Sequence, residues 1–265
     1  MSLLAALFRR RMLRPLWRRL HGISLVGLNY WASEFEMTGE RQALNYVAGR
    51  LTDVSHPVIF DVGANVGDYS VACLEAFGAE CHVHAFEPAA STFAVLQGRL
   101  ARYPDVTLHK LGLGDRAGTA TLRSSGSCSS IASLVDLDRP VRPFADEFSE
   151  EVETETIDSL CERQRIDRID FLKLDIEGFE LAALRGAERM IREGNIRYIQ
   201  FEFGENNVSS RTFLADFARL LADYILYQVV PGGPVRWCYD GGSSEIFATM
   251  NYLAERIASD RGPTG

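Results

Sequence analysis

The sequence predicts an α/β fold with a mostly parallel sheet, and three observations support this prediction. Short apolar runs that are typical of buried strands alternate along the chain with segments of helical periodicity. The first two of these runs each end in an acidic residue and lead into a helix, as strands do at the ligand-binding edge of such a sheet. The length of 265 residues suits one domain whose sheet is covered on both faces.

The first strand is predicted at 57–62, and a glycine-rich turn follows it. The turn has the pattern D-x-G-x-N-x-G, formed by Asp61, Gly63, Asn65 and Gly67. Glycines at such a turn let the backbone approach a ligand, and the following helix offers unpaired N–H groups. Dinucleotide-binding turns use G-x-G-x-x-G to accept a pyrophosphate. Asp61 would instead repel phosphate and attract an ammonium group, which favours S-adenosylmethionine over NAD.

The second strand is predicted at 81–87 and ends in Glu87. Pro88 follows and suits the first position of a helix. A carboxylate at the end of the second strand is placed to accept hydrogen bonds from both ribose hydroxyls of a nucleoside. Either motif alone is weak, but two acid-tipped strands in register, each followed by a helix, predict a cofactor site.

The rest of the chain continues the alternation, with one interruption. The stretch 111–160 holds two alternating segments, 119–122 and 152–157, which predict an added hairpin beside the Ser-rich loop 124–130. That loop is either a solvated connection or a lid. Further strands are predicted at 105–109, 169–176, 198–203, 225–230 and 245–250, with fraying after residue 253.

Two helices are predicted between these later strands. One runs from about 178 to 191 and ends near Gly194, a good left-handed stop. The other follows the strand at 198–203, with Ser209 or Ser210 as its N-cap.

Charged residues at the end of the strand at 169–176 are candidates for catalysis. The strands predicted at 57–62 and 169–176 flank the point where strand order reverses. Asp61 and Asp175 should therefore face one crevice. Lys173, Asp175 and Glu177 alternate as strand residues do and share one side. Transfer of a methyl group from S-adenosylmethionine needs the acceptor oxygen held about 3–3.5 Å from the methyl carbon. A general base adds a factor of about 10²–10⁴ in rate. The alternative is that Lys173 merely pairs with Asp175 or Glu177 and shapes the loop.

Two further residues are candidates beside the acceptor. Glu202 lies near the end of the strand at 198–203 and could contact it. His109 ends the third strand and is either a base or, more often at such a place, a structural histidine.

The chain resembles the FkbM-type S-adenosylmethionine-dependent methyltransferases. The resemblance extends from about residue 58 to 203 and rests on FDVGANVGDYS (60–70), HAFEPAASTFAVL (84–96) and DFLKLDIEGFELAALRGAERMI (170–191), among other stretches. It implies a Rossmann-like class I methyltransferase sheet, mostly parallel with an antiparallel last strand. It also implies transfer to a hydroxyl of a sugar, glycan or other small-molecule natural product. Asp115 matches a position close to the adenine, although an ordinary turn aspartate is the alternative.

Other functions stay open at this point. The same fold could methylate nitrogen or a protein side chain, or bind the cofactor without transfer, or act as an oxidoreductase. Asp61 argues against an oxidoreductase. Nitrogen methyltransferases often carry an acidic-aromatic-proline motif after the fourth strand, whereas this chain has Asp175-Ile176-Glu177-Gly178, which favours oxygen.

Charge and cysteine content restrict the partners. The formal net charge is −8, and residues 1–22 hold six arginines and no acid, so the remainder carries −14. That balance argues against a nucleic-acid substrate. The five cysteines show no metal-ligand spacing, so no metal site is predicted. Cys73 and Cys81 fall in or beside predicted core elements, which favours buried thiols over the alternative of a disulfide or a reactive site.

The N-terminal segment is predicted to be a basic amphipathic helix. Leu13, Leu16, Trp17 and Leu20 share one face, opposite to several arginines, and a helix starting near Arg14 avoids the clash of Pro15. It could make weak peripheral contact with an anionic membrane through residues 1–22, or pack on the domain, or form a tail. We expect a basic amphipathic segment with helices at 1–50, a methyltransferase domain at 51–255 and a tail at 256–265. The expected location is the cytoplasm, with the inner membrane surface as the alternative.

Overall fold

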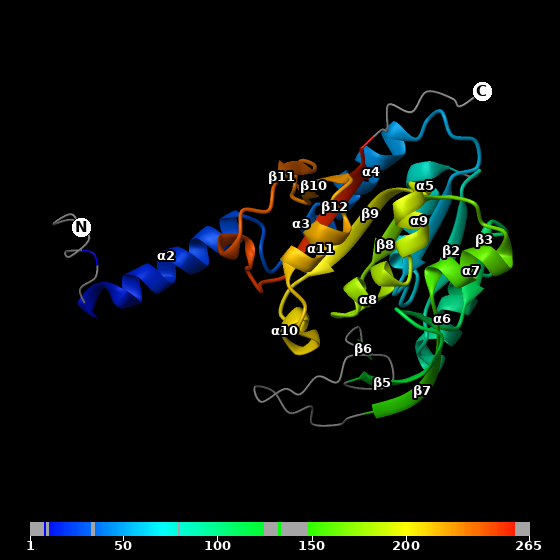
Figure 1. Ribbon diagram of the computed structural model, residues 1–265, viewed down its shortest axis with the longest axis horizontal. Helices are drawn as coiled ribbons and strands as arrows, with labels where there is room; N and C mark the ends of the chain where they lie inside the picture. Colours follow the sequence, from blue (N-terminus) through cyan, green and yellow to red (C-terminus); the bar gives the residue numbers. More distant parts are fainter. Residues whose placement is uncertain are drawn as a thin grey trace.

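The computed structural model of the protein describes residue 8 and residues 11–32, 35–78, 80–124, 132–133 and 148–257. Its main sheet has eight strands in the order β11-β10-β12-β9-β8-β1-β2-β3 (Figure 1). The five strands from β9 to β3 pair in parallel, as predicted. They are β1 (Val58–Val62), β2 (His82–Phe86), β3 (Val106–His109), β8 (Ile169–Leu174) and β9 (Ile196–Phe203).

The other three strands extend the sheet beyond β9. The last strand, β12 (Met250–Arg256), pairs antiparallel with β9, which confirms the predicted direction. Next to it lies β10 (Tyr224–Gln228), followed by the short β11 (Val235–Trp237), which the sequence pattern did not predict.

The prediction of the last strand at 245–250 was wrong, because Glu245 has another partner. Its carboxylate accepts the backbone N–H groups of Leu214 and Ala215, so this residue caps a distant helix and does not pair in a strand. The predicted fraying after residue 253 was also wrong within the described chain. Glu255 accepts hydrogen bonds from three tyrosine hydroxyls, which hold β12 in place to its end: Tyr46, Tyr198 and Tyr227.

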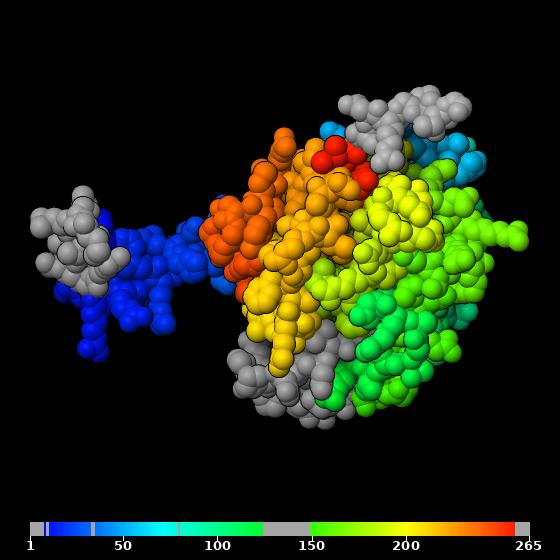
Figure 2. All heavy atoms as spheres, viewed as in Figure 1, coloured from blue at the N-terminus to red at the C-terminus, as the bar shows by residue number. Residues whose placement is uncertain are grey.

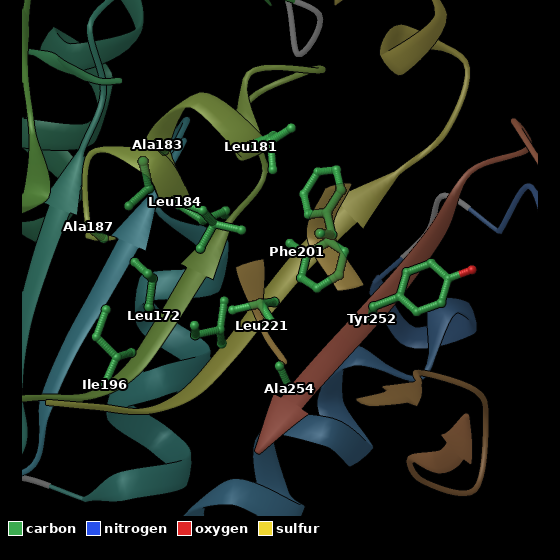
Figure 3. Close-up of a cluster of buried hydrophobic side chains, with 14 of the residues drawn as sticks. Leu172, Leu181, Ala183, Leu184, Ala187, Ile196, Phe201, Leu221, Tyr252 and Ala254 are labelled. Atoms are coloured by element: carbon green, nitrogen blue, oxygen red, sulfur yellow. The ribbon is translucent and has the colours of Figure 1, made fainter. Parts of the chain in front are cut away.

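Helices cover both faces of the sheet and create two cores. Alternate residues of each strand point to opposite faces, so Leu172 belongs to one core while its neighbour Phe171 belongs to the other. Figure 3 shows the first core, where Leu172 and Phe201 of the sheet lie against Leu184 and Leu221. This face is covered by α7 (Ile157–Gln164), α8 (Glu180–Arg185), α9 (Glu188–Glu193) and α11 (Leu214–Leu220).

The second core lies under α4 (Glu40–Arg50) and α5 (Asp68–Phe77). Leu44 and Val47 of α4 are fully buried there together with Ile59 of β1. A smaller cluster forms where α6 (Ala90–Leu100) packs beside the turn that follows β1. The remaining short helical elements are α3 (Phe35–Thr38), α10 (Asn206–Ser210) and η2 (Gly242–Ser244).

Three predicted helix boundaries differ from the structure. Helix α6 begins at Ala90 and not at Pro88, because Glu87 accepts the N–H of Ala89 and holds the chain extended there. The helix expected over 178–191 is split into α8 and α9. The split follows because the carbonyl of Gly186 accepts the N–H of Asp158, whose carboxylate in turn caps α9. Gly194 ends α9 in a left-handed conformation, as predicted.

The third difference concerns the helix after β9. Ser209 and Ser210 belong to the separate helix α10, and the N-cap of α11 is Phe213. The backbone N–H groups at the start of α11, for which a serine N-cap was predicted, donate instead to the carboxylate of Glu245.

The predicted hairpin extension forms a second sheet, which is larger than expected. Its order is β4-β7-β5-β6, and β5 pairs antiparallel with β7 over seven residues. The strands are β4 (Gly112–Leu113), β5 (Gly118–Ser124), β6 (Ala132–Ser133) and β7 (Phe148–Glu155). The Ser-rich loop lies outside the described residues from 125 onwards.

The N-terminal helix extends away from this body (Figures 1 and 2). A short turn, η1 (Arg11–Leu13), leads into α2 (Arg14–Gly27), and Pro15 lies in its first turn, so the predicted start is confirmed. Of the residues of α2 only Leu25 is buried. Among the described residues, the structure has no helix that is both long enough and apolar enough to cross a membrane.

Candidate active site

The candidate site lies at the carboxyl ends of β1 and β8, which are neighbours in the sheet. Asp61 and Lys173 are paired in register across these strands. The Asp61 side chain is fully buried, and its Oδ2 accepts a hydrogen bond of 2.6 Å from the Ser70 hydroxyl. Its Oδ1 lies 3.6 Å from Lys173 Nζ and makes no hydrogen bond within the described residues. Asp61 thus reaches the site chiefly through its ion pair with Lys173.

Lys173 is the buried cation of this site. Its ammonium lies 3.3 Å from Asp175 Oδ2 and 4.9 Å from the ring centre of Tyr69. Burial by itself lowers the pKa of Lys173, but the carboxylates of Asp175, Asp61 and Glu40 outweigh it, so the pKa lies above its ordinary value. Lys173 therefore stays protonated and cannot act as a base. The interpretation as an ion pair with Asp175 is supported, and Glu177 takes a different partner.

A buried polar network behind Lys173 escaped the sequence analysis. Gln200 of β9 donates from Nε2 to Glu40 Oε1 at 2.9 Å and accepts from the Tyr69 hydroxyl at 3.0 Å. The second oxygen of Glu40 accepts from the Thr38 hydroxyl at 2.9 Å. Burial and the charge of Asp175 raise the pKa of Glu40, whereas Lys173 opposes this. The local signal was Gln200, a polar residue between the apolar Ile199 and Phe201 of β9.

The turn after β8 is held in a strained conformation. Glu177 and Gly178 both have positive φ, at 55° and 97°. Glu180 stabilises the turn from below, since its Oε1 accepts the N–H groups of Ile176 at 2.9 Å and Gly178 at 3.1 Å. The Glu177 carboxylate accepts a hydrogen bond from Asn206. The turn thus fixes where Asp175 and Glu177 point.

Glu202 belongs to the same group of carboxylates. Its side chain is half-buried near the end of β9. Burial, followed by the charges of Asp175, Glu177, Glu180 and Glu40, raises its pKa well above the ordinary value. The structure therefore brings together Lys173, Asp175, Glu177 and Glu202, all four candidates that the sequence predicted for catalysis. A carboxyl group with a raised pKa is a stronger base once it is ionised.

The glycine-rich turn after β1 is attached to the end of β2. The N–H groups of Gly63 and Ala64 both donate to the carbonyl of Phe86. Asn65 has a φ of 49°, a left-handed conformation that asparagine tolerates better than most residues. A Cβ on Gly67 would lie 2.9 Å from a methyl carbon of Leu96, so this glycine serves the packing of α6.

Glu87 at the end of β2 is buried and holds two backbone N–H groups. One oxygen accepts from Asn65 at 3.1 Å and the other from Ala89 at 2.9 Å. Burial raises its pKa, and these two hydrogen bonds oppose the change. Because each carboxylate oxygen has two acceptor positions, Glu87 can still accept two hydroxyls. These acceptor positions fit the ribose hydroxyls of S-adenosylmethionine, the cofactor of the family that the sequence resembles.

Two other predicted residues lie apart from this group. Asp115 is exposed in the turn between β4 and β5, and its contact with an adenine stays a prediction. His109 Nε2 lies 3.0 Å from His84 Nδ1, and its ring stacks on Phe86. Burial, together with Arg163, lowers the pKa of His109 to about 4. It is therefore neutral near pH 7 and already paired, which favours the structural interpretation.

Cysteines and metal ligands add little to the site. Cys73, Cys81 and Cys161 are buried thiols, Cys238 is exposed, and Cys128 lies outside the described residues. In the part of the chain that the structure describes, no cluster of three His, Cys, Asp or Glu side chains has a geometry suited to a metal ion.

Comparison with known proteins agrees with the geometry. The chain is 26% identical over 148 residues to the hexuronic acid methyltransferase AglP of Haloferax volcanii, covering 56% of each protein. It is 32% identical over 158 residues to the 31-O-demethyl-FK506 methyltransferase FkbM of Streptomyces tacrolimicus, covering 49% of this chain and 59% of that one. The chain spans less than two thirds of the length of these relatives. The sequence model of the methyltransferase FkbM domain matches residues 61–227, more than half of the chain. The protein therefore belongs to the FkbM methyltransferase family.

Proposed function

We propose that the protein transfers a methyl group from S-adenosylmethionine to a hydroxyl oxygen of a sugar, glycan or other small-molecule natural product. The observation that carries this proposal is the convergence of Asp175, Glu177 and Glu202 around the end of β8, together with the buried cation Lys173. Carboxylates at this place suit an acceptor that presents hydroxyl groups. One relative is named for a hexuronic acid and the other for 31-O-demethyl-FK506, and both names support the same acceptor class.

The proposed mechanism assigns separate tasks to these residues. The bound cofactor would supply a methyl group on a sulfonium. Glu87 would hold its ribose hydroxyls, and the turn at Gly63 would let the backbone approach it. Asp175 and Glu177 would orient the acceptor through hydrogen bonds. Lys173 acts as a positioning residue, because it ties Asp61 and Asp175 together across two strands.

Glu202 is the proposed general base. Because burial and the neighbouring carboxylates raise its pKa, the carboxyl keeps its proton to a higher pH than an ordinary glutamate and becomes a base only when it ionises. The rate of methyl transfer should therefore increase with pH through the raised pKa of Glu202.

The test begins with the acceptor. Purified protein is incubated with methyl-labelled S-adenosylmethionine and a panel of hexuronic acids, glycans and hydroxylated natural products, and the labelled atom is located by mass spectrometry. Label on a hydroxyl oxygen is the expected result. Label on nitrogen or on a protein side chain would overturn the proposed acceptor class. Cofactor binding is measured separately by calorimetry, where Glu87→Ala should weaken it.

Variants then test the assigned base. Glu202→Gln should lower kcat by about 10²–10⁴ while the affinity for S-adenosylmethionine stays unchanged. The exposed Glu188 on α9 provides a matched control. Glu188→Gln makes the same chemical change on a helix and not at the end of β8 or β9. Full turnover in Glu202→Gln, or an unchanged pH profile, would remove Glu202 from the mechanism.

A further inference from the structure

Helix α2 presents a row of large apolar side chains that stay exposed, although the ring of Phe8 packs edge-on against Trp17. The exposed fractions are 48% for Leu16, 37% for Trp17, 45% for Leu20 and 67% for Ile23. Met12, just before the helix, is 77% exposed. Figure 2 shows the helix standing clear of the body of the protein. Exposed apolar side chains that are contiguous in this way mark an interaction surface.

Four large apolar residues of this segment share one face, and Arg14 and Arg18 lie on the opposite face. Residues 12, 16, 20 and 23 follow one another at spacings of four, four and three, so they form a single stripe along the helix. At 100° per residue, Arg18 lies almost diametrically opposite the centre of this stripe, and Arg14 lies beside it on that opposite face. Trp17 flanks the stripe with an indole, the side chain that is enriched where apolar and wet regions meet.

The charge distribution along the chain narrows the choice of occupant. Residues 1–22 contain six arginines and no acid, while the rest of the chain carries −14. An anionic surface would therefore attract the helix and repel the catalytic domain. A second copy of α2 would bring together two sets of arginines, which opposes their association. An apolar stripe bordered by arginines fits a layer of anionic headgroups above acyl chains.

We propose that α2 docks the protein on an anionic lipid surface, with the stripe of Met12, Leu16, Leu20 and Ile23 in the interface and the arginines at the headgroups. The helix lies in the plane of the surface, and the domain stays outside it. The apolar stripe buries only a modest area, so the binding is reversible. It decreases with salt, because the electrostatic attraction extends over about one Debye length. This inference does not depend on the chemistry of methyl transfer.

The test measures partition of the full chain onto vesicles by sedimentation. The protein should bind vesicles of phosphatidylglycerol and phosphatidylcholine at about 0.05 M salt, and binding should fall steeply by about 0.5 M. Pure phosphatidylcholine vesicles should bind it far less. Trp17 reports insertion, since its fluorescence should shift to the blue on anionic vesicles and this shift should be lost in Trp17→Phe.

Full-chain variants separate the two faces of the helix. Arg14→Glu with Arg18→Glu should lower the partition coefficient by more than about 25-fold, from about five-fold for each neutralised arginine. The matched control, Arg185→Glu with Arg192→Glu, changes the same net charge on exposed residues of α8 and α9 and should stay within about two-fold of the parent. Leu16→Ser with Leu20→Ser should also lose binding, whereas Val95→Ser with Val235→Ser, both exposed on the domain, should not.

Three outcomes would overturn the proposal. The full chain could fail to bind anionic vesicles at low salt. The two arginine pairs could have equal effects, in which case only net charge matters. Alternatively, the parent could be a dimer that Leu16→Ser with Leu20→Ser converts to a monomer, in which case a second copy covers the stripe. Because the assay needs no acceptor, none of these results bears on the proposed reaction.

Discussion

At the scale of single residues, Glu180 is a buried acid whose pKa is raised. It is fully buried under the turn that follows β8, and burial raises its pKa from 4.5 to about 7. The folded state therefore binds more protons than the unfolded state between these two pH values. Stability that Glu180 contributes is fully present below pH 4.5 and is lost as the pH rises to about 7.

We predict that Glu180→Gln flattens the pH dependence of the free energy of unfolding between pH 4.5 and about 7. The amide oxygen can still accept the N–H groups of Ile176 and Gly178, and no charge has to be buried. Between pH 5 and pH 8 the free energy of unfolding of the variant should gain up to about 3 kcal/mol relative to the parent. Urea unfolding at several pH values measures it, with exposed Glu188→Gln as the control. Parallel curves for all three proteins would contradict the prediction.

At the scale of elements, the turn after β1 is fixed by the turn after β8. Gly63 has a φ of 80°, and a Cβ there would lie 1.9 Å from the carbonyl oxygen of Asp175. The obstacle is backbone, so rotation of a side chain cannot relieve it. This close approach holds the turn after β1 against the turn after β8.

Gly63→Ala should therefore destabilise the fold by at least about 2 kcal/mol and abolish cofactor binding. Gly98→Ala is the matched control, because Gly98 lies inside α6 with open space around it. That control should be neutral, or stabilising by about 0.5–1 kcal/mol. Melting curves and calorimetric titration with S-adenosylmethionine measure both variants. A Gly63→Ala protein that melts and binds normally would show that the two turns can move apart.

The sequence predicted what depends on local pattern and on the rules of parallel sheets. Apolar runs ending in acids located β1, β2 and β8, and the adjacency of β1 and β8 brought Asp61 together with Lys173 and Asp175. The failures have long-range causes. Glu245 reads as a strand residue, but its partners are N–H groups 30 and 31 residues away. No local pattern could indicate that Glu40 meets Gln200, 160 residues later.

At the scale of the whole molecule, α4 is bound to the sheet through polar as well as apolar contacts. The expected boundary at residue 51 stays a prediction, although α4 contributes both to the second core and to the network behind Lys173. The matched family region begins at residue 61, so this contribution comes from outside it.

Glu40→Ala should lower the free energy of unfolding by about 1–3 kcal/mol, because it leaves the buried side-chain amide of Gln200 without its acceptor. Glu36→Ala removes an exposed partner of Arg41 in the preceding turn and should leave the urea midpoint nearly unchanged. Equal midpoints for the two variants would mean that α4 is held by apolar packing alone.

The excess of carboxylates around Lys173 has a consequence for turnover. Methyl transfer would convert a cationic sulfonium into a neutral thioether, so the ligand would lose its attraction to Asp175 and Glu177 in the same event. S-adenosylhomocysteine should therefore bind more weakly than S-adenosylmethionine, and Asp175→Asn should reduce this difference by up to about five-fold. Calorimetry with both ligands measures the ratio of the two dissociation constants. The crevice would then release its product through a change in the ligand's own charge, without needing any part of the protein to move.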